Sequence, residues 1–98
     1  MYIVIKESVP FGFALVAAAH ASLATYLKFK DSAEMQEWVS GPFYKVICKA
    51  SDAEFEKAKE AGDFVAITES ALGGAEVALG FRPRSGWPTL FRFLKLLR

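Results

Sequence analysis

The sequence predicts a single α/β domain, residues 1–98, in which helices cover both faces of a mixed four-stranded sheet. Three observations lead to this class. Short β-branched or aromatic runs alternate with helical patterns, two Ser/Asp-x-x-Glu capping boxes precede such patterns, and a Gly73-Gly74 turn joins the last two strand-like runs. The expected order is β-α-α-β-α-β-β-α, and the tight glycine turn makes the last two strands antiparallel.

The first strand and the helix after it are expected in the N-terminal quarter of the chain. Residues 2–5 are too few and too β-branched for a helix, and Pro10 and Gly12 interrupt the chain as a loop. A helix is expected over 13–29, where alanines allow close approach to a sheet. Its larger apolar residues recur at helical spacing: Leu15, Val16, Ala19, Leu23, Tyr26 and Leu27. Although residues 9–26 carry no charge, we expect the most buried helix of the fold rather than a membrane span.

Two further helices and a strand are expected in the middle of the chain. Residues 31–34 are typical of a capping box and begin a short helix that ends at Gly41-Pro42. Residues 43–48 form the second strand. A second capping box, 51–54, begins a helix that closes at Gly62.

The C-terminal third is expected to hold two strands and a last helix. The strands are residues 64–68 and 77–81, and Pro88 lies near the first turn of the helix. The buried face of that helix is expected to be Leu90, Phe91, Leu94 and Leu97. A basic row on its other side, Arg92, Lys95 and Arg98, would suit a phosphate backbone or simply face solvent.

Charge is balanced overall but not along the chain. The net charge of +1 predicts no particular partner. Residues 31–76 hold ten acidic and four basic residues, whereas residues 77–98 hold five basic and no acidic ones. One end of the molecule is therefore expected to be basic, unless acidic helices of the same fold lie beside it.

The cysteine and histidine content excludes several kinds of site. Cys48 is the only cysteine, so no disulfide forms within the chain, and a reducing compartment such as the cytoplasm is expected. One cysteine and one histidine, His20, do not supply the usual metal ligands, so no metal is predicted. Gly73-Gly74 lacks the lysine and the following helix of a phosphate-binding loop, and no cofactor is expected.

Five polar residues are candidates for a site. His20 either projects from its helix into a cleft, where it could orient a substrate or transfer a proton, or packs among alanines with one ring nitrogen bonded to a backbone carbonyl. Glu69 and Ser70 follow the third strand, where sites are commonly built, or end it in solvent. Arg82 and Arg84 follow the fourth strand and could bind a phosphate or carboxylate, or face water.

Several segments together resemble one enzyme family. They are the strand at 2–5, Gly12 leading into residues 16–22 (Val-Ala-Ala-Ala-His-Ala-Ser), residues 43–50, residues 65–71 and residues 77–83. In this order they are similar to the type-2 peptidyl-tRNA hydrolases, and the similarity spans nearly the whole chain. The resemblance implies a mixed four-stranded sheet flanked by helices. It also implies hydrolysis of the ester that joins a peptide to the ribose of tRNA, which needs an activated water, a cation for the developing oxyanion and a basic surface for RNA.

The chain departs from that family at its charged positions. Two family lysines fall on Phe11 and Phe13, and the active-site acid falls on Ser70, with Glu69 beside it. Of the polar set, only His20 carries over. Replacing two lysines by phenylalanine makes a cationic cleft apolar, and transition-state stabilisation is lost with the charges.

Two readings of function follow. The first is a divergent member without ordinary hydrolase activity, a binding domain whose apolar cleft around Phe11, Phe13 and His20 takes another small ligand or a protein. The second is a weak or rewired hydrolase. In it, His20 with Glu69 or Ser70 would place water, and the arginines at 82 and 84 with the last helix would hold tRNA. No membrane partner is expected, and a homodimer through the last helix or a strand edge is possible.

Overall fold

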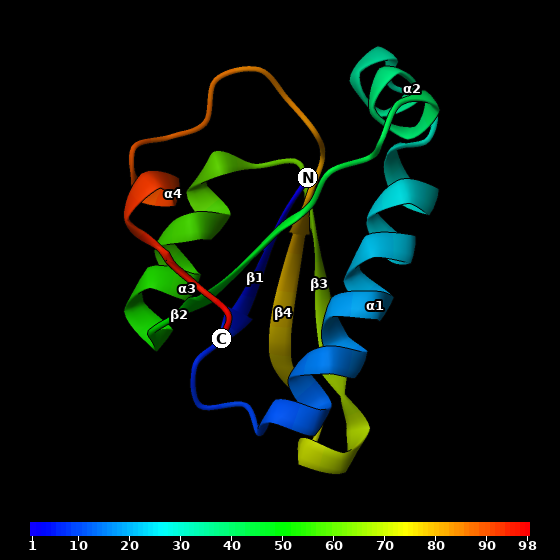
Figure 1. Ribbon diagram of the computed structural model, residues 1–98. Helices are drawn as coiled ribbons and strands as arrows, with labels where there is room; N and C mark the ends of the chain where they lie inside the picture. Colours follow the sequence, from blue (N-terminus) through cyan, green and yellow to red (C-terminus); the bar gives the residue numbers. More distant parts are fainter.

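The computed structural model describes all of residues 1–98, and Figure 1 shows its elements along the chain. They are β1 (Tyr2–Lys6), α1 (Phe11–Phe29), α2 (Ala33–Ser40), β2 (Val46–Ala50), α3 (Asp52–Ala58), the 3-10 helix η1 (Lys59–Ala61), β3 (Phe64–Glu69), the 3-10 helix η2 (Ser70–Leu72), β4 (Ala75–Phe81), α4 (Leu90–Phe93) and β5 (Lys95–Leu96).

The strands form one mixed sheet in the order β3-β4-β1-β2-β5. β1 and β2 are parallel, and the other three pairs are antiparallel. The prediction of an α/β domain with a mixed sheet is confirmed, and so is the antiparallel pairing of β3 with β4. Their turn depends on Gly73 and Gly74, whose φ angles of +70° and +77° are costly for residues with a side chain.

The sheet has five strands rather than four, because the last helix is shorter than the sequence predicts. α4 ends at Phe93, and Leu94 has extended backbone angles (φ −69°, ψ 135°). Lys95 and Leu96 then pair with Lys49 and Cys48 at the edge of β2. The basic row expected on the last helix therefore does not form, since only Arg92 belongs to α4 and the other two residues lie in or after β5.

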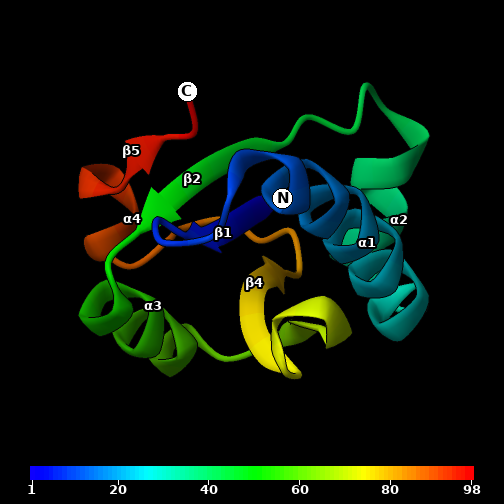
Figure 2. The same ribbon diagram turned by 90° about the horizontal axis from the view of Figure 1, so that it is seen from below.

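A hydrophobic core lies on each face of the sheet. α1 covers one face, where Met35 of α2 joins the alanines of α1. α3 and α4 cover the other, where Phe55 and Phe91 pack on Cys48 and Phe81. Figure 2 shows α1 and α3 on opposite sides of the sheet, which confirms the expectation of helices on both faces.

α1 is oriented with its small residues inward. Ala14, Ala17, Ala18, Ala21 and Thr25 are buried against the sheet. The larger residues of the helix point the other way, and Leu15, Leu23 and Leu27 are more than half exposed. The larger apolar residues that recur at helical spacing therefore lie mostly on the solvent side of the helix, because only small side chains allow the helix axis to lie this close to the strands.

The two short helices α2 and α3 begin at serine caps. The box at α3 is complete, since the Ser51 hydroxyl accepts from the Glu54 amide and the Glu54 carboxylate accepts from the Ser51 amide. At α2 the cap is Ser32, whose hydroxyl accepts from the Met35 amide, and not Asp31 one residue earlier. Met35 itself is fully buried in the core.

Candidate functional site

Apart from His20, the residues that the sequence singled out lie at two opposite ends of the sheet. Phe11 and Phe13 begin α1, close to the end where β3 leaves the sheet at Glu69 and β4 enters it (Figure 1). Arg82 and Arg84 follow the far end of β4, after a strand of 7 residues. A strand of that length spans roughly 23 Å, so the arginines do not reach a ligand held at the other end.

His20 lies in the middle of α1 and is exposed to solvent. Its ring is therefore not packed among the buried alanines of the helix. Three surface hollows, of about 440, 290 and 420 Å³, are lined by other residues, and none includes His20, Phe11 or Phe13. His20 lies on the convex outer side of α1.

Glu69 has a local structural role. It precedes η2, and its carboxylate accepts a 3.1 Å hydrogen bond from the Ala71 amide. Ser70 next to it is exposed. The Glu69 carboxylate thus caps and orders the turn of the β3–β4 hairpin. It has no other acidic or basic side chain in hydrogen-bond contact.

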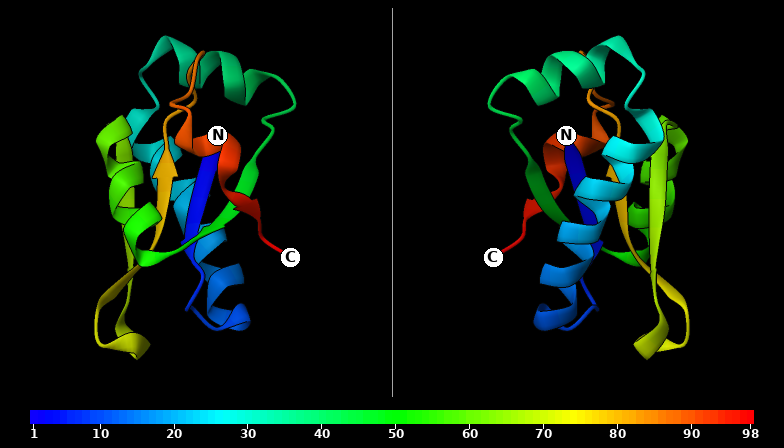
Figure 3. Two further views of the ribbon diagram at one scale, coloured as in Figure 1. Left: turned by 90° about the vertical axis from the view of Figure 1, so that its left-hand side faces the viewer. Right: turned by 90° about the vertical axis from the view of Figure 1, so that its right-hand side faces the viewer.

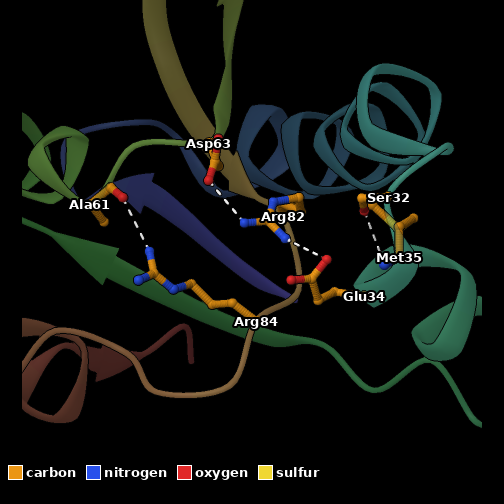
Figure 4. A network of polar contacts seen from close by, with 7 residues as sticks. All are labelled: Ser32, Glu34, Met35, Ala61, Asp63, Arg82 and Arg84. Atoms are coloured by element: carbon orange, nitrogen blue, oxygen red, sulfur yellow. Dashed lines mark hydrogen bonds and ion pairs between the residues drawn. The ribbon is translucent and has the colours of Figure 1, made fainter.

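Arg82 is held in an ion-pair network between three elements (Figure 4). Its guanidinium contacts Asp63 at 2.9 Å and Glu34 of α2 at 3.0 Å. The hydrogen bond that Arg82 donates to the Asp63 carboxylate, together with its pairing with Glu34, raises the pKa of Arg82 above its ordinary value, against the opposing effect of desolvation. With two carboxylates already bound, this arginine has little capacity left for a phosphate.

Arg84 turns away from α2. Its guanidinium donates a 3.1 Å hydrogen bond to the carbonyl oxygen of Ala61 and lies over the ring of Trp87 (Figure 4 shows the first contact). Arg82 and Arg84 therefore join the loop after β4 to α2, to Asp63 before β3 and to η1. Arg84 also lines a surface hollow beside α2.

An aromatic hollow beside α2 was missed by the sequence reasoning. It has a volume of about 440 Å³ and is lined among others by Glu37, Trp38, Phe43 and Tyr44. Phe43 has a left-handed backbone (φ 38°), and Tyr44 is 77% exposed. The signal available in the sequence was the run of three aromatic residues around Gly41-Pro42, which was assigned to a helix end and a strand.

The Lys45 ammonium already occupies one side of these rings, 5.2 Å from the Trp38 centroid and 4.5 Å from that of Phe43. The Trp38 indole nitrogen donates to the carbonyl oxygen of Tyr44 at 2.7 Å. These contacts fix the loop before β2. The aromatic rings form one side of the hollow, next to the carboxylates of Glu34 and Glu37 on α2.

The largest uncovered apolar feature is the outer side of α1, which we call the α1 face. It consists of Phe11, Leu15, Val16, Leu23 and Leu27 around the smaller Ala19 and the ring of His20. Exposure of the five large side chains ranges from 46% to 61%. No Lys, Arg, Asp or Glu occurs from Phe11 to Leu27, and in the right-hand view of Figure 3 no other element lies over this helix.

The length and apolar composition of α1 would also allow it to cross a membrane. A core helix that buries its alanines against a sheet meets the same criterion, so this is weak support for a membrane span. No group of three or more His, Cys, Asp or Glu side chains is placed to hold a metal ion.

Comparison with known proteins adds no relative to this description. No protein-family model matches the chain, and no curated protein matches it significantly.

Proposed function

We propose that this protein is a binding domain of the type-2 peptidyl-tRNA hydrolase kind that lacks ordinary hydrolase activity and docks an apolar partner on the α1 face. The observation that carries the proposal is Phe11, which is 60% exposed at the start of α1, where the family that the sequence resembles has a lysine. An uncharged phenylalanine in water at that position favours an apolar contact over a bound phosphate or oxyanion.

The environment of the other candidate residues supports the loss of hydrolysis. The Glu69 carboxylate caps η2, and the two carboxylates of Glu34 and Asp63 neutralise Arg82. His20 has neither a carboxylate to orient it nor a nucleophile within hydrogen-bond reach. Acyl transfer needs a base, an orienting group and an oxyanion cation converging on one carbonyl carbon, and these groups are spread over both ends of the sheet.

The shape of the α1 face supports a protein rather than a small molecule as the partner. Small ligands are held in concave pockets that bury most of their surface, whereas the α1 face is the convex side of one helix. Rows of apolar side chains four residues apart are the form in which one helix packs against another.

The experiment that tests the loss of activity is single-turnover release of peptide from an N-blocked aminoacyl-tRNA. Wild type, His20→Ala and a Phe11→Lys/Phe13→Lys variant are compared after circular dichroism has shown that each is folded. We expect wild type to release peptide no faster than the uncatalysed control. Clear turnover by wild type that His20→Ala abolishes would instead establish the second reading, a rewired hydrolase that binds tRNA, and would overturn the proposal.

A further inference from the structure

We infer that the partner of the α1 face is a second copy of this chain, bound through an antiparallel α1–α1 contact that crosses at Ala19. This inference rests on the proposed function only in taking the α1 face as the docking surface. A second copy fits this face because the row of residues along it is symmetric about its centre.

The symmetry is in the row of residues spaced four apart. Phe11, Leu15, Ala19, Leu23 and Leu27 follow one ridge of the helix, and the smallest of them is the middle one. A two-fold axis through Ala19 places Leu15 of one copy opposite Leu23 of the other and Phe11 opposite Leu27. Large residues thus meet large residues on both sides of the crossing, and alanine meets alanine where the helices come closest.

Ridges of this kind pack into one another at a crossing angle of about −50°, with helix axes roughly 8 Å apart where the central residues are small. The ridge from Phe11 to Leu27 spans roughly 24 Å, and its larger side chains lie on either side of the crossing, where the two helix axes diverge. Both copies contribute the same surface, as a two-fold interface requires.

Charge favours the antiparallel over the parallel arrangement. Lys6 and Glu7 precede α1 and cancel in charge, whereas Lys28, Lys30 and Asp31 at its other end leave a net charge of +1. A parallel pair would bring the two positive ends together, and an antiparallel pair separates them. In the antiparallel pair the two helix dipoles also point in opposite directions, which is the favourable arrangement.

The area of the face sets the strength expected of the contact. The five large side chains expose on the order of 500 Å², which matches the largest apolar patches of ordinary monomers but is below the ~800 Å² per partner of a typical stable interface. We therefore expect a dimer that dissociates at micromolar rather than nanomolar concentration.

Sedimentation of the full chain from about 1 µM to about 1 mM tests the inference. Wild type should change from monomer to dimer over this range, and Leu23→Glu should raise the dissociation constant on the order of 100-fold or more, because the two-fold axis buries two carboxylates. Leu96→Glu is the matched control, since Leu96 is a similarly exposed leucine on β5. A wild-type chain that remains monomeric, or a dimer that Leu96→Glu dissociates and Leu23→Glu does not, overturns the inference.

A cysteine placed on the axis gives a second, geometric test. Two Ala19→Cys chains should form a disulfide across the dimer on mild oxidation, since their Cα atoms would approach within the roughly 7 Å that a disulfide needs. Ala53→Cys, an exposed position on α3 across the sheet, should not. Equal cross-linking of both variants would contradict the crossing at Ala19. Flotation with neutral lipid vesicles tests the alternative that the α1 face binds a lipid surface. A chain that binds vesicles and stays monomeric in solution overturns the inference.

The outcomes for the dimer and for the proposed function are separable. A chain that stays monomeric and does not hydrolyse peptidyl-tRNA refutes the dimer and leaves the binding domain standing. A dimer that hydrolyses this substrate refutes the proposed function and leaves the dimer standing.

Discussion

Thr25 of α1 lies directly on Gly80 of β4, and the contact exists because residue 80 has no side chain. The Thr25 hydroxyl, the one buried polar side chain of the protein, donates a 2.6 Å hydrogen bond to the carbonyl oxygen of Ala21. A Cβ atom at position 80 would overlap this hydroxyl and would approach the Ala21 carbonyl oxygen to 2.9 Å. α1 and the sheet are therefore fixed at a distance that only glycine permits.

Gly80→Ala should lower the free energy of unfolding by about 2–3 kcal/mol, because neither the helix backbone nor the buried hydroxyl can move aside cheaply. Thr25→Ala in the same chain should recover part of this loss, since it removes the first clash and leaves the second. Urea denaturation measures both. Gly12→Ala is the control, because position 12 has open space on the outside of α1, and there alanine should stabilise the helix by about 0.5–1 kcal/mol. Equal effects at positions 80 and 12 would refute the close contact.

Local sequence patterns predicted the elements that local interactions stabilise. The Ser51 capping box and the Gly73-Gly74 hairpin depend on residues close to one another in the chain, and the structure contains both. The end of the chain was mispredicted for the opposite reason. Leu90 to Leu97 has spacing compatible with a helix, and pairing with β2, some 47 residues earlier, decides that its second half is a strand.

The same distinction applies to the candidate site. The sequence places Arg82 after a strand, where it could bind a phosphate or carboxylate or face water, but its partners Asp63 and Glu34 come from distant parts of the chain. Which side of α1 packs against the sheet also does not follow from the residues of the helix alone. Alanines and leucines give two opposite apolar sides on this helix, and only the short distance to Gly80 selects the alanine side for the core.

Glu34 should make the stability of the fold dependent on acid pH. Hydrogen bonding of its carboxylate by its own backbone amide, and then by Arg82, lowers the pKa of Glu34 below the ordinary 4.5. Because the folded value lies below the unfolded one, the stabilisation is fully present above the ordinary value and is lost as the pH falls through the folded value. Glu34→Gln should therefore be less stable than wild type near neutral pH, and the two should converge on acidification.

Urea denaturation from neutrality down to about pH 3 measures this difference. Glu37→Gln is the control, since Glu37 lies on the same helix and makes no ion pair. If the difference in the free energy of unfolding between wild type and Glu34→Gln were the same at the lowest pH as at neutrality, the carboxylate would act through something other than its charge.

Cys48 should be inert toward alkylating reagents in the folded protein. It is 1% exposed within β2, and burial raises the pKa of its thiol, so both access and the thiolate fraction are low. Reaction with iodoacetamide should be slow in buffer and become fast in denaturant, with mass spectrometry as the readout. The exposed thiol of Ala53→Cys serves as the internal standard for an ordinary rate. Comparable rates at both cysteines in buffer would mean that the β2–β5 edge opens readily.

The two sides of α1 should respond to substitution in opposite ways. Ala21 is fully buried against the sheet, so Ala21→Leu adds a side chain where none fits and should cost about 1–3 kcal/mol of stability. Leu23 is 61% exposed two residues later, and Leu23→Glu should change the stability of the monomer by less than about 0.5 kcal/mol. Both are measured by urea denaturation at about 1 µM, where the expected dimer is dissociated and linkage to association does not contribute. If Leu23→Glu proved as damaging as Ala21→Leu at this concentration, the leucine side would belong to the core of the single chain, and the α1 face would not be a surface at all.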